Sequence, residues 1–278
     1  MSPMISIATV NLNGVRAAAK RGLVPWLDEQ SPDVVLMQEV RADAATTAGL
    51  LGDGWRLAVV PSRMKGRAGV AVAVRADSAG APAVADVRGE LDGDETDRDS
   101  GRWLEVDLDL ASGARLTVVS AYFHSGEVDT PRQEAKMAHL PRIGARMAAL
   151  LAQAQAGGRQ TVVAGDFNVV RSRADIKNWT PNHNKRAGVL DEEIAFLDRW
   201  VEQGWRDVTR DLAGAVQGPY TWWSWRGKAF DNDAGWRIDY QFATPELAER
   251  ARSFRIGRAA SYDARFSDHA PLTVDYDL

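Results

Sequence analysis

Short runs of apolar and β-branched residues recur along the chain and predict a series of strands. The runs lie at residues 5–10, 34–38, 57–60, 69–74, 103–110, 116–122, 161–164, 238–243 and 272–276. Apolar residues occupy consecutive rather than alternate positions in several of them, for example in VVLM and TVVA. This pattern is typical of strands that are covered on both faces, so we expect sheets sandwiched between other layers.

Two longer segments between these runs have the spacing of amphipathic helices. Apolar residues recur at steps of three and four in 132–155, which two glycines follow, and again in 191–203, which ends before Gly204. Each helix would place its apolar stripe on a sheet. The acidic, glycine-containing segment 86–101 has neither period and predicts an exposed loop, although its acids could alternatively form a cation site.

The organisation of the chain favours one domain. The sequence has no tandem repeat, no low-complexity linker and no sharp change in composition over its 278 residues. With 45% hydrophobic and 26% charged residues, it has the composition of a globular protein with a substantial core. We therefore expect a single α/β domain, residues 1–278, with mixed sheets.

Composition also limits the chemistry and the location. The chain has no cysteine, so any metal must bind oxygen or imidazole ligands. The first residues show no basic segment before a long apolar run, and no stretch is long and apolar enough for a membrane span, so a cytoplasmic protein is expected. A net charge of −4 argues against nonspecific coating of nucleic acid but permits a local basic groove.

Polar residues that can bind metals lie at the ends of several predicted strands. They are Asn11, Asn13, Gln38, Glu39, Asp166 and Asn168, with Asp268 and His269 just before the last strand. Each one alone is explained by a turn or by solvation. Together, oxygen donors of this kind suit a divalent cation such as magnesium, which keeps several waters and leaves room for a phosphate.

His269 is the best catalytic candidate among the four histidines. It alone follows an aspartate at the entrance of a predicted strand, whereas His139 falls on a predicted helix as a surface or packing residue. An imidazole that polarises a phosphoryl oxygen or activates a water needs a carboxylate to orient it. Asp239 is a plausible partner.

Seven motifs occur in an order that resembles the exonuclease III family of apurinic/apyrimidinic endonucleases, within the endonuclease/exonuclease/phosphatase superfamily. They are TVNLNGVRA, LMQEV, SAYF with SGE, GDFNVV, NW with KRAGVLDEE, GWRIDY and SDHAPL, and they span nearly the whole chain. The resemblance implies a four-layer α/β sandwich, in which two mixed sheets pack face to face with helices outside. It also implies an exodeoxyribonuclease III or AP endonuclease, a phosphodiester hydrolase.

The resemblance further implies roles for individual residues. Asn11, Glu39 and Asp268 would hold magnesium or manganese, with Asn13 nearby. Asp166 would position or deprotonate the attacking water, and Asn168 would bind the scissile phosphate. Tyr122 would contact that phosphate or assist catalysis, and His269 with Asp239 would stabilise the developing charge. Metal-assisted in-line attack by water is consistent with this set.

Residues 221–240 are unusually rich in tryptophan and charge. In the family this stretch is similar to the wall of a pocket for a flipped, base-free sugar, with Trp222, Trp236 and Ile238 as its apolar lining. Arg237 would then lie near the DNA backbone, and Arg226 and Lys228 could add phosphate contacts. We expect the neighbouring Trp223 and Trp225 to serve packing instead.

Two segments depart from the usual family pattern. After the tyrosine strand the chain reads YFHSG, so that His124 and Ser125 replace a usual Pro-Asn pair. Ser125 can hydrogen-bond a phosphate but lacks the reach of an amide. The loop NWTPNHNKRAG also differs from relatives, although Lys185 and Arg186 retain positive charge there.

The leading functional hypothesis is therefore a metal-dependent DNA-repair phosphodiesterase. It would cleave 5′ to abasic sites, act as a 3′-to-5′ exonuclease and trim 3′ ends, as a monomer on double-stranded DNA and without a membrane partner. One alternative is another phosphoesterase of the superfamily, a phosphoinositide phosphatase or a sphingomyelinase-like enzyme. A second alternative is a catalytically silent DNA-binding protein that has kept the fold.

Overall fold

Two six-stranded sheets form the centre of the computed structural model, which describes residues 4–76 and 80–278. In spatial order, the first sheet contains β11 (Ala251–Ile256), β12 (Leu272–Asp277), β1 (Met4–Asn11), β2 (Val34–Gln38), β4 (Val70–Arg75) and β3 (Trp55–Val60). The second contains β5 (Ala83–Arg88), β6 (Trp103–Asp109), β7 (Arg115–Tyr122), β8 (Gln160–Asp166), β10 (Asp239–Ala243) and β9 (Arg206–Asp207).

Both sheets are mixed. In the first sheet β1 is parallel to β2 and antiparallel to β12. In the second sheet β7 is parallel to β8, and β8 is antiparallel to β10. A parallel pair needs a long crossover, and the helix α4 (Pro131–Gln155) provides one between β7 and β8.

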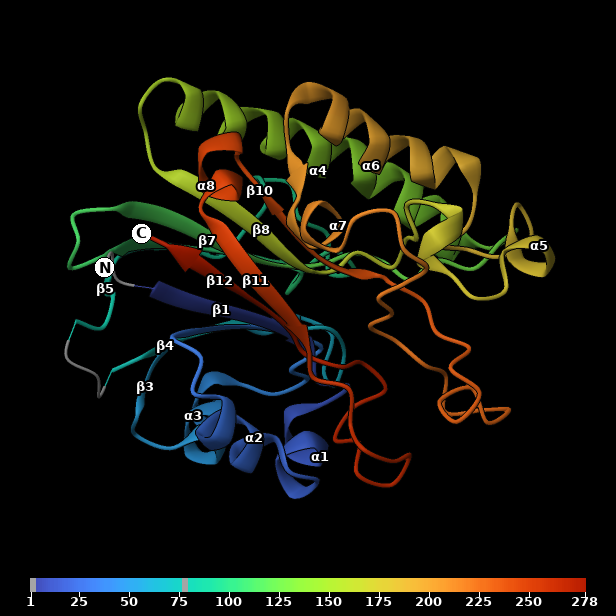
Figure 1. Cartoon of the computed structure of the whole chain (residues 1–278), viewed down its shortest axis with the longest axis horizontal. Coiled ribbons are helices and arrows are strands. Elements are labelled where there is room, and N and C mark those ends of the chain that lie inside the picture. Colours follow the sequence, from blue (N-terminus) through green and yellow to red (C-terminus); the bar gives the residue numbers. More distant parts are fainter. Residues whose placement is uncertain (1–3, 77–79) are drawn as a thin grey trace.

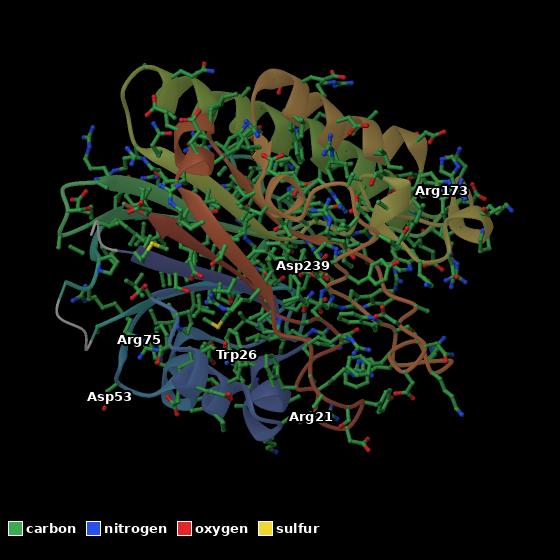
Figure 2. All side chains as sticks on the ribbon, viewed as in Figure 1. Arg21, Trp26, Asp53, Arg75, Arg173 and Asp239 are labelled. Carbon is green, nitrogen blue, oxygen red and sulfur yellow. The ribbon has the colours of Figure 1, made fainter. Side chains whose placement is uncertain are left out.

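Helices cover the outer faces of the two sheets (Figure 1). On the first sheet these are α1 (Val15–Lys20), α2 (Leu23–Gln30) and α3 (Ala44–Leu51), and Trp26 of α2 lies on that side in Figure 2. On the second sheet α4 is accompanied by α6 (Asp191–Gln203). Shorter helices occupy the connections: η1 (Arg173–Asp175), α5 (Trp179–Asn182), α7 (Val208–Ala213) and α8 (Pro245–Glu249). The predicted four-layer sandwich is confirmed.

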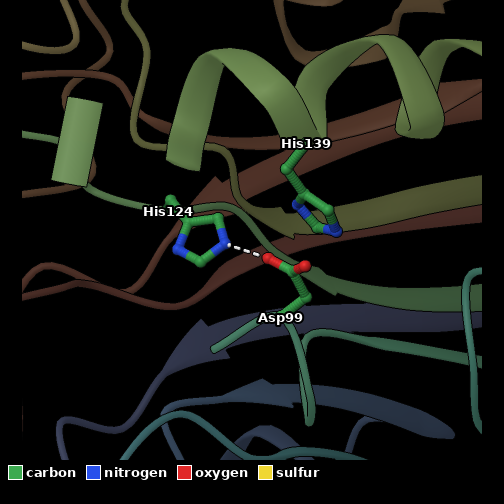
Figure 3. A group of neighbouring side chains, drawn as sticks. All are labelled: Asp99, His124 and His139. Atoms are coloured by element: carbon green, nitrogen blue, oxygen red, sulfur yellow. Dashed lines mark hydrogen bonds and ion pairs between the residues drawn. The ribbon is translucent and has the colours of Figure 1, made fainter. Parts of the chain in front are cut away.

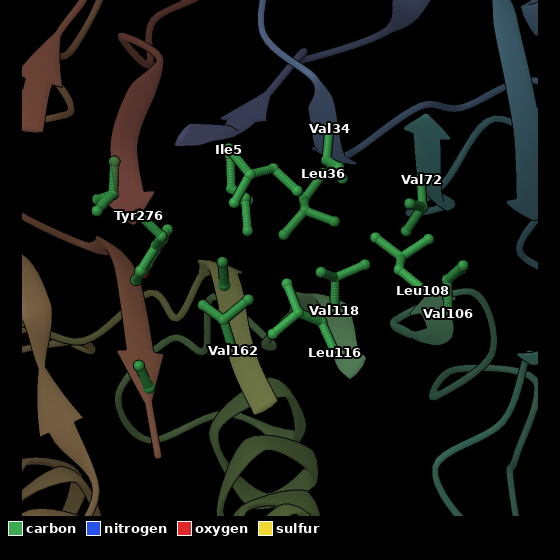
Figure 4. Close-up of a cluster of buried hydrophobic side chains, with 14 of the residues drawn as sticks. Ile5, Val34, Leu36, Val72, Val106, Leu108, Leu116, Val118, Val162 and Tyr276 are labelled. Atoms are coloured by element: carbon green, nitrogen blue, oxygen red, sulfur yellow. The ribbon is translucent and has the colours of Figure 1, made fainter. Parts of the chain in front are cut away.

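Three apolar cores join the four layers. The central core lies between the sheets and is built from branched side chains such as Ile5, Leu36, Val72, Val118 and Val162 (Figure 4). A second core joins the second sheet to α4 and α6, and a third joins the first sheet to α1, α2 and α3. Because the inner strands are covered on both faces, they carry the consecutive apolar residues seen in the sequence.

Buried amides also connect the two sheets. The Gln38 side chain donates to Ser120 Oγ at 3.0 Å, and Ser120 donates to the Met37 carbonyl at 2.9 Å. Gln241 donates to the Ile7 carbonyl at 2.8 Å. Gln38, one of the polar strand-end residues, is therefore an inter-sheet residue, because it points into the core and has its hydrogen bonds satisfied there.

The predicted strands are all present, with ends shifted by up to two residues. Strands β5, β9 and β11 were missed because they are short or largely exposed and lack an apolar run. The start of the predicted loop 86–101 is wrong, because Asp86 to Arg88 pair with β6 as the end of β5. None of the described helices has the length and apolar character needed to cross a membrane.

Candidate active site

The ends of the central strands bring the predicted catalytic residues to one edge of the sandwich. Asn11 is the last residue of β1, and Glu39 follows β2, which runs parallel to it. Asp166 ends β8 and pairs directly with Asp239, the first residue of β10. His269 lies in the segment before β12, and Asp239 is visible in the interior of Figure 2.

Two asparagine side chains connect the carboxylates at this edge. Asn11 Nδ2 donates to Glu39 Oε1 and to Asp166 Oδ2, both at 2.9 Å. Asn13 Nδ2 donates to Asp268 Oδ1 at 3.0 Å. These hydrogen bonds join residues that are up to 255 positions apart in the chain, so the site is preorganised by the fold rather than by one loop.

The NLN and DFN motifs adopt the same local turn. In each, the first side chain accepts from the backbone N–H two residues later: Asn11 Oδ1 from Asn13, and Asp166 Oδ1 from Asn168, both at 2.9 Å. Asn13 and Asn168 have φ values of 48° and 51°, and Glu39 has 47°. Such left-handed conformations cost roughly 1–3 kcal/mol each and tend to cluster at functional sites.

His269 and Asp239 form the predicted pair. The Nδ1 atom of His269 lies 2.9 and 3.1 Å from the two Asp239 carboxylate oxygens, so Nδ1–H donates to Asp239. Nε2 faces Asp166, whose Oδ2 atom is 3.7 Å away. Burial opposes the charged form of His269, but the Asp239 and Asp166 carboxylates raise its pKa to about 10. The imidazole is therefore a cationic hydrogen-bond donor at neutral pH.

Asp166 occupies an unusual electrostatic position. Burial raises its pKa to about 7, although the positive charge of His269 opposes the rise. Three donors hold the carboxylate in place: Asn11 Nδ2, the backbone N–H of Asn168, and the side-chain Nδ2 of Asn168, the last at 3.0 Å. A fixed carboxylate that exchanges its proton near neutral pH can act as a general base.

The oxygen donors at this edge fit a divalent cation. Glu39 and Asp268 supply carboxylates. Glu39 accepts from Asn11 and pairs with Arg41, and Asp268 accepts from Asn13 and Trp222, so each carboxylate keeps further lone pairs. The side-chain carbonyl oxygen of Asn11, Oδ1, accepts one hydrogen bond, from the backbone N–H of Asn13, and can accept a second. This all-oxygen set is the kind that magnesium and manganese prefer.

Tyr122 lies beside this cluster at the end of β7. Burial and the nearby Glu39 carboxylate raise the pKa of its phenol, so the hydroxyl remains a donor at neutral pH. The Arg102 guanidinium lies 4.7 Å from the centre of its ring. Tyr122 also lines a cavity that opens next to Glu39.

That cavity, which we call the arginine pocket, was not anticipated from the sequence. It has a volume of about 440 Å³ and contains Glu39, Tyr122 and Ser125 in its wall. Five arginines from four segments of the chain also line it: Arg41, Arg67, Arg98, Arg102 and Arg132. No local sequence signal marks them, because only the fold brings them together.

The tryptophan-rich stretch divides into two parts. Trp222 donates from Nε1 to Asp268 Oδ2 at 3.0 Å, and its ring lies 5.5 Å from that of Trp236 and 6.4 Å from His269. Ile238 belongs to the same apolar cluster. Trp223 is buried in another cluster and Trp225 stacks on Arg265, so these two serve packing, as predicted.

The expectation that Arg237 contacts the DNA backbone is wrong. Its side chain is 0% exposed. Nε donates to Asp175 at 2.6 Å, and the two terminal nitrogens donate to the two Asp207 oxygens at 2.8 Å each. A guanidinium with two buried carboxylate partners is a structural ion pair that cannot reach a phosphate. Arg226, Lys228, Lys185 and Arg186 are exposed.

Lys136 is a buried residue of the site that sequence reasoning missed. Its ammonium group donates to the Asn168 carbonyl at 2.9 Å and pairs with Glu193 at 2.7 Å. It thereby connects α4 and α6 to the DFN turn. The signal was present, because Lys136 shares the helical face of Leu140, Ile143 and Met147, where a charge is unexpected.

Comparison with known proteins agrees with this geometry. Residues 8–269 match the model of the endonuclease/exonuclease/phosphatase family. Exodeoxyribonuclease III of Haemophilus influenzae is 27% identical over 96% of this chain and 97% of its own length. The DNA-(apurinic or apyrimidinic site) endonuclease of Dictyostelium discoideum is 22% identical over 99% of this chain and 71% of its own.

Solved structures show the same fold. An AP endonuclease from Archaeoglobus fulgidus superposes with a TM-score of 0.80 and 26% identity, over 99% of this chain and 100% of that one. A 3′-5′ exonuclease from Neisseria meningitidis superposes with a TM-score of 0.79 and 24% identity, over the same shares. The chain therefore belongs to the endonuclease/exonuclease/phosphatase family, in the group of exonuclease III and the AP endonucleases.

Proposed function

We propose that the chain is a metal-dependent DNA-repair phosphodiesterase with one catalytic domain over residues 1–278. It cleaves 5′ to abasic sites, degrades duplex DNA from 3′ ends and trims damaged 3′ termini. The observation that carries the proposal is the position of Asp166. Its carboxylate is fixed by Asn11 and Asn168 and faces the His269–Asp239 pair.

In the proposed reaction a water attacks the scissile phosphorus. Asp166 positions this water and accepts its proton, which is the role its geometry and raised pKa support. His269, held by Asp239, donates from Nε2 to a phosphoryl oxygen as negative charge develops there. Tyr122 binds the same phosphate, because its hydroxyl is a donor beside Glu39. Asn168 donates its two Nδ2 hydrogens to Asp166 and to the Phe123 carbonyl, and would turn one of them to the phosphate.

Glu39, Asp268 and Asn11 would hold the metal, with Asn13 supporting Asp268. A bound magnesium ion would polarise the phosphoryl group and offset the charge of the leaving oxygen. Manganese suits the same oxygen ligands. The chain's own contribution is the fixed arrangement of these oxygens by the hydrogen bonds of Asn11 and Asn13.

The arginine pocket supports DNA as the substrate. Arginine forks match phosphate oxygens, and the pocket adjoins both Glu39 and Tyr122, where the scissile phosphate would lie. Ser125 lines it and would add a hydrogen bond. A Neisseria relative with the same fold is described as a 3′ phosphatase bound to product DNA hairpin.

The aromatic cluster supports recognition of an abasic sugar. Trp222, Trp236 and Ile238 lie together next to His269, and Trp222 is hydrogen-bonded to Asp268. A sugar without a base would fit beside these rings, whereas an intact nucleotide would be excluded by its bulk. Lys185 and Arg186, exposed after α5, would contact the backbone of the same strand.

A panel of phosphoesters tests the proposal. Purified protein is incubated with magnesium and a duplex carrying one abasic-site analogue, an undamaged duplex with a recessed 3′ end, a phosphoinositide or sphingomyelin. We expect cleavage of both DNA substrates and none of the lipids. Conversion of a lipid with no DNA cleavage would replace the proposal by another phosphoesterase. DNA binding without any conversion would indicate a silent DNA-binding protein. Magnesium as the physiological metal, a cytoplasmic location and a monomeric state stay predictions.

A further inference from the structure

A second cluster of buried polar residues lies outside the active site. It consists of Asp99, from the loop between β5 and β6, His124, which follows β7, and His139 of α4 (Figure 3). The three side chains each offer one ligand atom, and these atoms lie within 4.8 Å of one another. All three residues are buried, with exposed fractions of 7%, 6% and 3%.

The hydrogen bonds of this cluster are incomplete. His124 Nε2 contacts Asp99 Oδ1 at 2.8 Å. His139 points toward the same carboxylate in Figure 3, but neither of its ring nitrogens has a hydrogen-bond partner among the residues that the structure describes. Leaving a buried polar group unsatisfied is costly, so an imidazole with two unpaired nitrogens calls for a ligand of its own.

We propose that Asp99, His124 and His139 bind one divalent transition-metal ion of the zinc class. Two imidazoles and one carboxylate form a mixed nitrogen and oxygen donor set, which such ions prefer and magnesium does not. The site is distinct from the active site, whose candidate ligands are Glu39, Asp268 and Asn11. It would satisfy one of the two unpaired ring nitrogens of His139.

Binding one ion requires the three ligand atoms, which lie within 4.8 Å of one another, to adjust their separations. Zinc bonds to nitrogen and oxygen are about 2.0–2.2 Å, so two tetrahedral ligand atoms lie about 3.3 Å apart. The 2.8 Å contact between His124 and Asp99 would therefore open by about half an ångström. Asp99 Oδ1 can turn to the ion because Oδ2 is already held by Thr96 at 2.8 Å and by Arg142 at 3.1 Å.

The charge states of the three residues suit metal binding. Burial lowers the pKa of His124 to about 3 and that of His139 to about 4, so both imidazoles are neutral at pH 7. Burial opposes ionisation of Asp99, but its hydrogen bonds to His124 and Thr96 lower its pKa to about 2. The nearby positive charge of Arg142 is offset by its pairing with Asp92. No imidazole has to lose a net proton, but the proton that His124 Nε2 shares with Asp99 must move to Nδ1 before Nε2 binds the ion.

The ion would join three separate segments of the chain. His124 is adjacent to Ser125 and Gly126, and all three residues line the arginine pocket. This pocket also gives an ion a route to the buried cluster. A bound ion would therefore fix the wall of the pocket against α4 and the loop before β6.

Zinc titration tests the proposal. Protein without an affinity tag is stripped with a chelator and titrated with Zn²⁺ against a chromophoric competitor, in excess Mg²⁺ so that oxygen-only sites are occupied. We expect one tightly bound zinc per chain. The His139→Phe variant should bind it on the order of 100-fold more weakly or worse, since loss of even an outer partner of a ligand costs 10- to 100-fold. The matched control is His183→Ala, which removes an outlying histidine that pairs with Asp191.

Further readouts make the outcome decisive. Co²⁺ should give the visible absorption of a four-coordinate site in the parent, and Zn²⁺ should raise the parent's Tm but not that of His139→Phe. If His139→Phe does not fold, Asp99→Asn, which keeps the shape of the side chain, decides instead and should also lose tight binding. The absence of tight zinc binding in the parent would overturn the proposal. The proposal would also be overturned if tight zinc binding were lost in His269→Asn but kept in His139→Phe and Asp99→Asn. The ion would then occupy the active site.

Discussion

Arg237 and the arginines of the arginine pocket illustrate how differently one residue type is used in this molecule. Arg237 is sealed in the interior, with Asp175 and Asp207 as carboxylate partners. The arginines of the arginine pocket come from the loops after β2, β3 and β5 and from the start of α4, and they line an open cavity beside Glu39. Burial and pairing make Arg237 part of the fold. Access to a cavity makes the pocket arginines available to a phosphate, although Arg41 is also paired with Glu39.

The contrast shows that charge alone does not identify a binding residue. Arg237 lies between Trp236 and Ile238, next to the proposed sugar pocket, and its place in the sequence suggested a DNA contact. Its guanidinium instead connects β9 and the segment before β10. Removing Arg237 should therefore change stability, whereas removing a pocket arginine should change binding.

The largest expected effect is on Arg237. Arg237→Met leaves the buried Asp175 and Asp207 carboxylates without their main partner, so the free energy of unfolding should fall by about 3–5 kcal/mol. Urea denaturation measures this change. The matched control, Arg206→Met, breaks only the surface pair with Asp211 and should cost less than about 1 kcal/mol. Unchanged stability with weakened DNA binding would reverse our assignment of Arg237.

Lys136 lies between the two cases, because it is buried but supports the active site. Lys136→Met leaves Glu193 with only neutral donors and frees the Asn168 carbonyl, so we expect a loss of about 2–4 kcal/mol and a lower kcat. Steady-state kinetics and denaturation together measure both. In the double variant Lys136→Met/Glu193→Gln, stability should partly return but kcat should not. Full recovery of kcat would show that the contact with Asn168 is unimportant.

Lowering the pH tests the buried ion pair between Arg237 and Asp175. Burial favours the neutral form of Asp175, but Arg237 and Arg210 outweigh it and hold its pKa below the usual value of 3.8. The Asp175 carboxylate thus makes its full contribution to the free energy of unfolding above pH 3.8. This contribution is lost as the pH falls through the lower pKa of Asp175 in the folded state. The difference in unfolding free energy between the parent and Asp175→Asn should shrink between pH 4 and pH 2. A constant difference would contradict the ion pair.

The smallest expected effects are those of single pocket arginines. Arg67→Ala and Arg132→Ala should each change the unfolding free energy by less than about 0.5 kcal/mol. Each should weaken DNA binding a few-fold and reduce the salt dependence of binding by about one phosphate contact. Arg115→Ala is the control, because Arg115 is exposed at the opposite end of β7 from Tyr122. Equal effects of all three variants would remove the special role of the pocket.

These cases show what could be predicted from the sequence. Apolar runs located the inner strands, because residues covered on both faces leave a strong local pattern. The motifs NLN, GDFN and SDH located the catalytic edge, since the first two form short turns at strand ends and SDH forms one in the segment before β12. The edge strand β5 and the helices α1 and α3 carry weaker patterns and were missed.

Features that depend on distant contacts could not be predicted in the same way. The burial of Arg237 depends on Asp175 and Asp207, which are 62 and 30 positions away. The arginine pocket gathers residues from Arg41 to Arg132. His139 could be assigned to a helix, but its approach to Asp99 and His124 became visible only in the folded chain.

The most direct test of the proposed function is cleavage of a labelled duplex with a single abasic-site analogue, by the parent and by Asp166→Asn, with and without magnesium. We predict one magnesium-dependent cut 5′ to the lesion in the parent. In Asp166→Asn the rate should fall by roughly 10²–10⁴-fold, the usual range for a general base, while the protein still binds the duplex. Equal rates for the two proteins, or no cut by the parent, would contradict the account.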